Sequence, residues 1–343
     1  MKTVHGGDIY RNQVSMDFSV NINPLGMPEN LEEAFHEAIK KCHEYPDIEA
    51  SKLKQAVSSS LDISSEYLLF GNGASEVFMG IVHAMKPKKI LIPIPSFYGY
   101  EYVAKAVESE IVYFNLEEAN DFLPSEDFYE AITEDIDLLF LTNPNNPTGK
   151  RIDKPYLSKL LSMCREKNIL VVLDECFIEF SGSEYSMISE IENYDNLLLV
   201  RAFTKIYAIP GVRLGYLICS NRLFLEKIER QLPEWNLSTF SQIVGVACVG
   251  QADYVEETIE YVKKERYFLA EGLKKLGIRV FESEANFILV YSQLPLYERL
   301  LQRGILIRDC ENFKGLCKGY YRIAVKQRID NEKLLKEIEG CME

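Results

Sequence analysis

Short apolar runs alternate with amphipathic stretches along the chain from about residue 65 onward. The runs are "YLLFGNG", "KKILIPIP", "SEIVYFNL", "IDLLFLTNP", "NILVVLDE", "NLLLVRAF" and "RLGYLICS". Each has the length of a strand and is rich in Val, Ile and Leu, as strands buried on both faces are. Between them, "SEVFMGIVHAM" and "KPYLSKLLSMCREKN" carry apolar residues at helical spacing. Repeated β-α units predict a mostly parallel sheet covered by helices on both faces.

A second region follows the long helical pattern "VEETIEYVKKERYFLAEGLKKLG". It contains the predicted strands "RVFESEANFILVYS", "GILIRDC" and "YYRIAVK" and a closing helix, "NEKLLKEIEGC". Its strands are fewer and its helices are amphipathic, which is typical of an α+β unit. We therefore expect an α/β protein with a large domain over residues 41–245 and a smaller α+β domain over 246–343. Residues 1–40 are expected to form an arm that joins the small domain.

The composition is that of an ordinary globular protein and restricts the partners. The 343 residues are 47% hydrophobic and 26% charged, with a formal net charge of -14. Such acidity argues against a nucleic acid or an anionic membrane as a partner, and no apolar run approaches the length of a membrane span. The eight cysteines lack any C-x-x-C, which favours buried free thiols in a reducing cytoplasm. The four histidines have no metal-ligand spacing, so no metal site is expected.

Polar loops follow five of the predicted strands. They are "GNGASE" (71–76), "PSFYGY" (95–100), "NPNNPTG" (143–149), "DECF" (174–177) and "RAFTK" (201–205). Ligands of open parallel sheets bind beyond the carboxyl ends of the strands, so these loops are expected to form one site. Taken singly, "GNGASE" and "NPNNPTG" are equally compatible with simple turns.

A lysine and a carboxylate stand out in this predicted site. Lys205 lies in an apolar stretch with Arg213 eight residues later, and an unpaired charge is costly in such surroundings. Asp174 ends an apolar strand, so a cationic partner is expected for it. Gly71, Gly73, Ala74 and Ser75 precede a predicted helix, which makes a backbone cradle for an anion. A reactive amine, a carboxylate and a phosphate cradle are what pyridoxal phosphate chemistry requires.

The motifs "NPNNPTG", "DE-x-F" and "TK-x7-R-x-G" follow successive strands in this order. With them, nearly the whole chain resembles the fold-type I pyridoxal-phosphate enzymes of the class I/II aminotransferase superfamily. The resemblance implies that Lys205 forms the Schiff base with the cofactor and that Asp174 faces its pyridine nitrogen. The other cofactor contacts that it implies are Ala74, Ser75, Phe97, Asn146, Thr204, Arg213 and Tyr45. Tyr45 is implied to reach the cofactor of a neighbouring subunit, which makes the functional unit a homodimer with shared sites.

Other segments resemble one particular group of enzymes within this superfamily. "VHGGDIYRN", "DFSVNINPLGMP", "RAFTKIYAIPGVRLGY", "ILIRDC" and "YYRIAVK" are similar to the threonine-phosphate decarboxylases of cobalamin biosynthesis, which are related to histidinol-phosphate aminotransferases. This implies decarboxylation of O-phospho-L-threonine, or a close phospho-amino acid, to aminopropanol phosphate. Amino transfer from histidinol phosphate to 2-oxoglutarate is the alternative. The implied substrate contacts are His5, Gly6, Asn21, Asn146, Arg308 and Arg322, with Arg322 forking the α-carboxylate.

The sequence departs from the family pattern at two positions. Phe177 stands where a tyrosine usually reaches the ring oxygen, and Ala202 where a hydroxyl is often found, although Thr204 is nearby. Apart from the resemblance, the position of His5 near the N-terminus favours an ordinary mobile terminal residue. Arg308 is equally a surface residue at a strand end.

Two other classes of function were compared with this hypothesis. A binding protein that keeps the fold without the cofactor is disfavoured by the intact set of Lys205, Asp174, Asn146 and Arg213. An NAD-dependent oxidoreductase would fit the β-α alternation. However, the chain has no G-x-G-x-x-G that opens a helix after the first strand.

Overall fold

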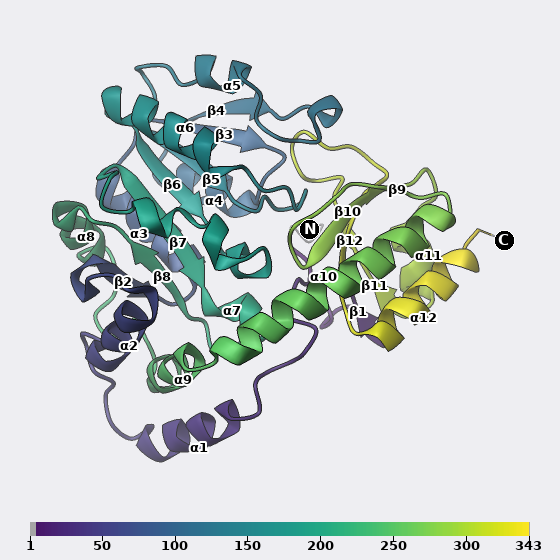
Figure 1. The fold of residues 1–343 in the computed structure, drawn as a ribbon, viewed down its shortest axis with the longest axis horizontal. Coiled ribbons are helices and arrows are strands. Elements are labelled where there is room, and N and C mark those ends of the chain that lie inside the picture. The colour runs from purple at the N-terminus through teal and green to yellow at the C-terminus, as the bar shows by residue number, and fades with distance from the viewer. Residues whose placement is uncertain (1–4, 343) are drawn as a thin grey trace.

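A seven-stranded sheet forms the centre of the computed structural model, which describes residues 5–342 (Figure 1). Residues 1–4, including Val4 of the "VHGGDIYRN" motif, lie outside the described part. The sheet order is β2-β8-β7-β6-β5-β3-β4. The strands are β2 (Leu68–Gly71), β3 (Lys89–Ile94), β4 (Glu110–Asn115), β5 (Leu138–Thr142), β6 (Leu170–Asp174), β7 (Leu197–Ala202) and β8 (Gly215–Ile218). Each of the seven apolar runs therefore forms a strand, as predicted.

The sheet is mostly parallel, with one reversed strand. The pairs from β4 through β3, β5 and β6 to β7 are parallel, whereas β8 is antiparallel to both β7 and β2. Between β7 and β8 the chain has only the short helix α7 (Phe203–Ile206), and a parallel crossover needs a longer connection. The prediction that all these strands are buried on both faces was wrong for β4, which is half exposed. β4 pairs with β3 alone at one edge of the sheet, whereas the other edge strand, β2, is buried because helices pack on it from both faces.

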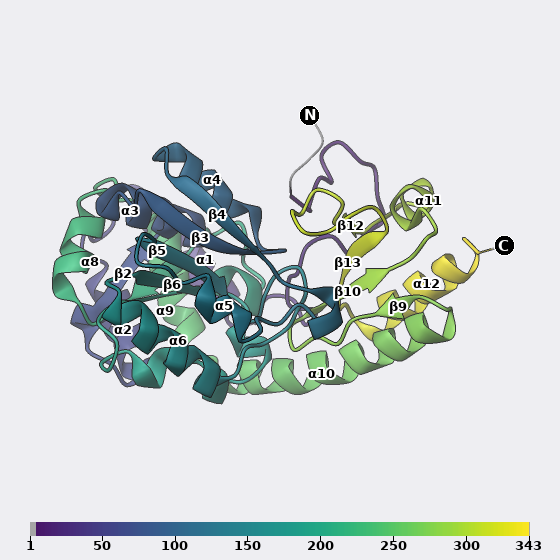
Figure 2. The ribbon, with the colours of Figure 1, turned by 90° about the horizontal axis from the view of Figure 1, so that it is seen from above.

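Helices cover both faces of the central sheet, as predicted (Figure 2). One face carries α3 (Ala74–Met85), α4 (Tyr98–Ala106) and α8 (Arg222–Glu229), and the other α2 (Ser51–Leu61), α6 (Lys154–Glu166) and α9 (Thr239–Val249). Successive side chains of a strand point to opposite faces. In β6, Val172 packs into the core on the α3 side, and Val171 and Leu173 pack into the core on the α6 side.

A smaller antiparallel sheet has the order β12-β13-β10-β9. Its strands are β9 (Arg279–Val280), β10 (Phe287–Tyr291), β12 (Arg308–Asp309) and β13 (Tyr320–Ala324). The long helix α10 (Ala252–Lys275) runs from the central sheet to this small sheet (Figures 1 and 2). Together with α11 (Leu296–Gln302) and α12 (Arg328–Glu339), it buries a second apolar core against the small sheet.

The N-terminal arm contacts both parts of the molecule. β1 (Met16–Asp17) pairs in parallel with β11 (Ile305–Leu306), next to the small sheet. Helix α1 (Leu31–Lys41) instead packs on α9, beside the central sheet. The domain boundaries near residues 40 and 245 stay predictions. The remaining elements are α5 (Asp127–Glu130) and the 3-10 turns Ser65–Tyr67, Glu118–Asn120, Ile178–Phe180, Ser183–Tyr185 and Met187–Glu190.

Helix starts follow ordinary capping chemistry. Asp153 accepts a hydrogen bond from the backbone of Tyr156 at the start of α6, and Asn221 and Ser238 do the same for α8 and α9. Within residues 5–342, the structure contains no helix of the length and apolarity that a membrane span needs.

A buried ion pair connects the ends of β6 and β7 in the central sheet. Arg201 donates from Nε and Nη2 to Glu175 Oε2, at 3.1 and 3.0 Å, and both residues are almost completely buried. The same carboxylate accepts hydrogen bonds from Ser186 Oγ at 2.6 Å and from the Met187 backbone at 2.8 Å. Every oxygen of Glu175 is thus bonded, which makes the pair tolerable in the interior.

Removing the cation of this pair should strongly destabilise the fold. Arg201→Met leaves the Glu175 carboxylate buried without its counter-ion, which is expected to cost about 3–5 kcal/mol of unfolding free energy. Urea unfolding followed by circular dichroism measures this change. The control is Lys41→Met, which removes an exposed pair with Glu37 and should cost at most about 1 kcal/mol. Equal effects of the two variants would contradict the prediction.

Candidate active site

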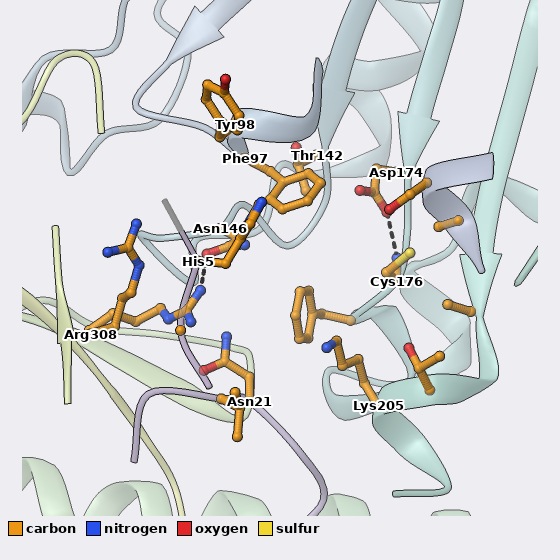
Figure 3. A pocket seen from close by; sticks show the side chains of 18 of the residues that line it. His5, Asn21, Phe97, Tyr98, Thr142, Asn146, Asp174, Cys176, Lys205 and Arg308 are labelled. Carbon is orange, nitrogen blue, oxygen red and sulfur yellow. Dashed lines mark hydrogen bonds between the residues drawn. The ribbon is translucent and has the colours of Figure 1, made fainter. Parts of the chain in front are cut away.

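One pocket collects the polar loops at the carboxyl ends of the central strands (Figure 3). All five predicted loops contribute to it. These loops line the pocket with Ala74, Ser75, Phe97, Tyr98, Asn146, Asp174, Cys176, Phe177, Ala202, Thr204 and Lys205, and Thr142 at the end of β5 and Arg213 add to the same wall. The N-terminal arm and the region of the small sheet close the other side with His5, Gly6, Ser19, Asn21, Arg308, Phe313 and Arg322. Every predicted site residue except Tyr45 therefore lies around the same pocket.

Asp174 ends β6 as a buried carboxylate. Its Oδ2 accepts a hydrogen bond from the Tyr100 hydroxyl at 2.6 Å, and its Oδ1 accepts one from the Cys176 backbone at 2.9 Å. Burial raises the pKa of Asp174, and hydrogen bonds from Cys176 and Tyr100 partly offset this effect. Among residues 5–342, no cation forms an ion pair with it. A ligand that brings a protonated nitrogen would supply the counter-ion that a buried carboxylate needs.

Lys205 lies one turn beyond the end of β7, on the short helix α7. Burial, followed by the positive charge of Arg322, lowers the pKa of its ammonium group to about 8. Within the described chain, its Nζ has neither a hydrogen bond nor an ion pair. A substantial fraction of the amine is therefore uncharged near neutral pH, as a nucleophile must be. Figure 3 shows Lys205 and Asp174 approaching the pocket from neighbouring strand ends.

The N-terminus of α3 and Arg213 form an anion cradle. Gly73 has a φ of +81°, and a Cβ added there would lie 2.3 Å from Arg213 Nη2. A Cβ added at Gly215 would lie 2.4 Å from the backbone nitrogen of Ala74. Glycine at these two positions lets the guanidinium and the first turn of α3 approach the same space. Free N–H groups at a helix start, the helix dipole and a cation together suit a phosphate, and the Ser75 side chain borders this space.

Two arginines of the small sheet face the pocket side by side. Arg308 and Arg322 are directly opposite partners in the antiparallel β12–β13 pair. Arg322 donates to Asn146 Oδ1 at 2.5 Å and to the Ser19 carbonyl at 2.7 Å, and its buried Nε has no partner among the described residues. Burial lowers the pKa of Arg322 to about 10. Its described partners are thus neutral oxygens, so an anionic ligand would stabilise it.

Arg308 makes its own contacts beside this pair. It donates to the Asp309 carbonyl at 2.6 Å and to Asn312 Oδ1 at 2.8 Å, and its guanidinium lies over the Phe313 ring. These contacts hold the side chain against the pocket wall. These contacts are local, whereas the position of Arg308 opposite Arg322 depends on the pairing of β12 with β13, which the local sequence could not predict.

The N-terminal arm contributes both a structural clamp and a pocket wall. Asn23 donates from Nδ2 to the Ile206 carbonyl at 2.7 Å and to Thr258 Oγ1 at 2.8 Å, and its backbone N–H reaches the Lys205 carbonyl at 3.1 Å. It therefore ties the arm to α7 and α10. Asn21, two residues earlier, is only 2% exposed, and its Oδ1 has no hydrogen-bond partner within residues 5–342. An amide in this state is a candidate ligand contact.

His5 and Gly6 border the mouth of the pocket. The His5 ring lies 6.0 Å from the Phe97 ring, centroid to centroid. Partial burial, then the charges of Arg308 and Arg322, lower its pKa, which favours the neutral imidazole. Gly6 packs on the Ser19 carbonyl, where an added Cβ would lie at 2.3 Å. The arm therefore approaches Ser19 as closely as it does only because residue 6 is glycine.

Tyr45 lies outside this pocket. Its side chain is 84% exposed, and its ring stands 5.2 Å from that of Trp235, beside a separate hollow near α1 and α9. At the two departures from the family pattern, Phe177 and Ala202 line the pocket with apolar surface. Thr204 is buried at the pocket and supplies a nearby hydroxyl.

Sequence reasoning missed the polar surroundings of Asp174. Tyr100, Thr142 and Cys176 were not predicted as site residues, yet all three lie at the carboxylate or one hydrogen bond away. A signal existed for Tyr100, because it follows Phe97 by three residues in a polar loop at a strand end. Nothing local indicated that its hydroxyl would meet Asp174.

Pyridoxal phosphate fits the donor set of this pocket. The cofactor offers a pyridine nitrogen to the cation-deficient Asp174, an aldehyde to the Lys205 amine and a phosphate to the cradle at Gly73 and Arg213. Asn146 uses its Oδ1 to accept from Arg322, so its amide Nδ2 remains a donor for the ring oxygen. The cofactor thus matches two groups of the described chain, namely the Asp174 carboxylate, which has no ion-pair partner, and the Lys205 amine, which has no hydrogen-bond partner.

Comparison with known proteins identifies the class. The chain matches the family described as "Aminotransferase class I and II" over residues 13–338, and it belongs to this family. A Caldanaerobacter subterraneus protein with the provisional name threonine-phosphate decarboxylase is 40% identical, over 99% of this chain and 94% of its own. The threonine-phosphate decarboxylase of Salmonella typhimurium is 32% identical, over 95% of this chain and 91% of its own.

Solved structures agree with the fold. The histidinol-phosphate aminotransferase of Clostridium acetobutylicum superposes with a TM-score of 0.90 at 36% identity, covering 95% of this chain and 98% of that one. The predicted family and fold class are thereby confirmed. Among the relatives are both decarboxylases and aminotransferases, as the sequence motifs indicated.

The lowered pKa of Lys205 is directly testable. In the apoprotein, the rate of reductive methylation of Lys205 should rise through a midpoint near pH 8, because only the uncharged amine reacts. Ordinary lysines have a pKa near about 10.4. Mass spectrometry of the Lys205 peptide after short exposures across the pH range measures the midpoint. Arg322→Gln removes a nearby positive charge, so it should move the midpoint upward. A midpoint near that of ordinary lysines in the unmutated protein would contradict the assignment.

Proposed function

We propose that this protein is a pyridoxal-phosphate-dependent decarboxylase of O-phospho-L-threonine, or of a close phospho-amino acid, that forms aminopropanol phosphate for cobalamin biosynthesis. The observation that carries the proposal is the pair of adjacent guanidiniums, Arg308 and Arg322, on the pocket wall above Lys205 and Asp174. A substrate with both a carboxylate and a phosphate needs two such groups. The relatives that are named threonine-phosphate decarboxylases, at 40% and 32% identity, support this choice.

The chain's own residues divide the chemical work. Once bound, pyridoxal phosphate supplies an electron sink for the electron pair left at the substrate's α-carbon. Asp174 keeps the ring nitrogen protonated by pairing with it in a shielded site. Asn146 donates from Nδ2 to the ring oxygen, and Arg213 with the α3 N-terminus holds the phosphate. Lys205 binds the cofactor and later returns a proton to the α-carbon, directly or through water.

The substrate is oriented by the small sheet and the arm. The residues that hold the substrate carboxylate would decide which bond at the α-carbon breaks. Arg322 forks the α-carboxylate and Arg308 supports the phosphate, with Asn21 and Gly6 completing the wall and His5 the mouth. Asn146 acts at both groups, because its Oδ1 orients Arg322 while its Nδ2 faces the cofactor.

A histidinol-phosphate aminotransferase is the second candidate. It is favoured by the 36% identity to the solved Clostridium acetobutylicum enzyme of that name over 95% of the chain. Its phosphorylated substrate would use the same cationic wall and the same Lys205. The two candidates differ in the product, carbon dioxide or an amino acid formed from 2-oxoglutarate.

The holoenzyme should release carbon dioxide from O-phospho-L-threonine, which is measured by coupled carbonate detection and by mass spectrometry of aminopropanol phosphate. Lys205→Ala should abolish turnover, because it removes the amine that binds the cofactor. Amino transfer from histidinol phosphate to 2-oxoglutarate without carbon dioxide release would refute the decarboxylase and establish the second candidate.

Arg308→Leu should lower kcat/KM for phosphothreonine by about thirty- to a thousandfold. Turnover of unphosphorylated threonine, the matched comparison, should hardly change.

The proposal includes a homodimer with shared sites. Tyr45 and Trp235 are large, exposed aromatic residues on one side of the molecule, and Ile48 and Val246 expose further apolar surface beside them. Exposed apolar surface of this kind favours a protein interface. A second copy would bring its Tyr45 to the phosphate of the first site.

Mixed subunits test this arrangement. Lys205→Ala and Tyr45→Ala homodimers should both be impaired, because each of their sites carries one defect. After unfolding and refolding together, the mixture should recover about a quarter of wild-type activity, since half of the dimers then hold one intact site. Recovery no greater than the sum of the separate variants would exclude a site shared in this way. Size-exclusion chromatography with light scattering verifies the dimer.

The predicted location and domain organisation belong to the same proposal. All eight cysteines are free thiols, which fits a reducing cytoplasm. We expect a large domain over residues 41–245 and a small one over 246–343, with residues 1–40 as an arm that joins the small domain.

A further inference from the structure

Tyr100 is fully buried on α4, and its hydroxyl lies behind two residues that line the pocket, Asp174 and Thr142. Its ring stacks on Phe140 with centroids 4.8 Å apart and planes 13° apart, and Phe78 and Phe97 contact it edge-on. A phenol hydroxyl in such an apolar cage must find polar partners. It has two, namely Asp174 Oδ2 at 2.6 Å and Thr142 Oγ1 at 2.7 Å.

The direction of these hydrogen bonds follows from proton counting. An ionised Asp174 can only accept, so the single hydroxyl proton of Tyr100 points to its Oδ2. The Tyr100 oxygen then accepts, and Thr142 donates its own proton to it. The result is a relay from Thr142 through Tyr100 to Asp174. The Cys176 backbone donates to the other carboxylate oxygen, so each oxygen of Asp174 carries one donor.

We propose that Tyr100, polarised by Thr142, is a positioning residue that sets the proton affinity and orientation of Asp174 and so keeps the proton on the ring nitrogen of pyridoxal phosphate. This inference rests on the cofactor in the proposed function, and it holds whichever substrate is used. A strong donor on Oδ2 stabilises the carboxylate as an anion. The proton shared between the carboxylate and the ring nitrogen therefore stays on the nitrogen.

Loss of the Tyr100 hydroxyl has a defined chemical consequence. Without it, Asp174 keeps the Cys176 donor but becomes more basic, and the shared proton moves toward the carboxylate. The ring then withdraws electrons less well, although the cofactor remains bound at Lys205. A role in packing alone would leave the protonation of the ring nitrogen unchanged, because phenylalanine preserves the aromatic contacts.

The test compares the holoenzyme with its Tyr100→Phe variant, loaded with cofactor that carries nitrogen-15 in the ring. The nitrogen-15 chemical shift is expected to move from the protonated toward the unprotonated pyridine value. kcat should fall by about ten- to a hundredfold, as expected for loss of a hydrogen bond to a charged group, with KM nearly unchanged. Thr142→Val should shift the nitrogen signal in the same direction by a smaller amount. The matched control is Tyr129→Phe, which removes another largely buried tyrosine hydroxyl, bonded to the Tyr156 carbonyl, and should change neither quantity.

An unchanged nitrogen-15 shift in folded Tyr100→Phe holoenzyme overturns the inference, whatever happens to the rate. If Tyr100→Phe does not fold, Thr142→Val carries the same measurement and the same criterion.

A cofactor analogue with carbon in place of the ring nitrogen gives a second readout. Tyr100→Phe should weaken binding of pyridoxal phosphate to the apoprotein but not binding of the analogue, and equal weakening of both would count against the relay. A shifted nitrogen signal in a protein that does not decarboxylate phosphothreonine supports this inference and refutes only the proposed substrate.

Discussion

A carboxylate buried at the end of a central strand is expensive unless a cation meets it, and the described chain gives Asp174 no such partner. Side chains from the ends of the neighbouring strands surround this carboxylate. β5 and β7 flank β6, so Asn146 and Lys205 extend from the strands on either side of Asp174. Tyr100 and the Cys176 backbone hold the carboxylate as an acceptor. The pocket is therefore complete only with a ligand that brings a protonated ring nitrogen to Asp174.

The opposite wall of the pocket carries positive charge at Arg322 and Arg213. Arg322 is a buried cation whose described partners are neutral oxygens, and Arg213 faces the free N–H groups at the start of α3. Burial is the main reason that the pKa of Lys205 is lowered, and the charges of Arg322 and Arg213 add to the effect because they disfavour a further cation nearby. The charges that attract an anionic substrate thus also help to keep the nucleophile uncharged.

The N-terminal arm joins these two walls. Asn23 fixes the backbone of the Lys205 turn to α10, while Ser19, four residues earlier, accepts from Arg322. A short stretch of chain thus sets the position of the cofactor lysine relative to the substrate arginine. The "DFSVNINP" motif is therefore more than a turn, because it contacts both the Lys205 backbone and Arg322. Asn23 bonds to partners far along the chain, which is why the local pattern could not reveal its role.

The sequence alone determined what depends on local periodicity and local chemistry. The seven strands, the helices between them, the loops at the strand ends and the special character of Lys205 and Asp174 were all predicted, because spacing and neighbours encode them. The tertiary structure decided what depends on distant partners. The side-by-side position of Arg308 and Arg322 follows from the pairing of β12 with β13. Tyr100 meets Asp174 across 74 residues and Arg322 meets Asn146 across 176. Packing of the whole chain selects such contacts, and no local pattern records them.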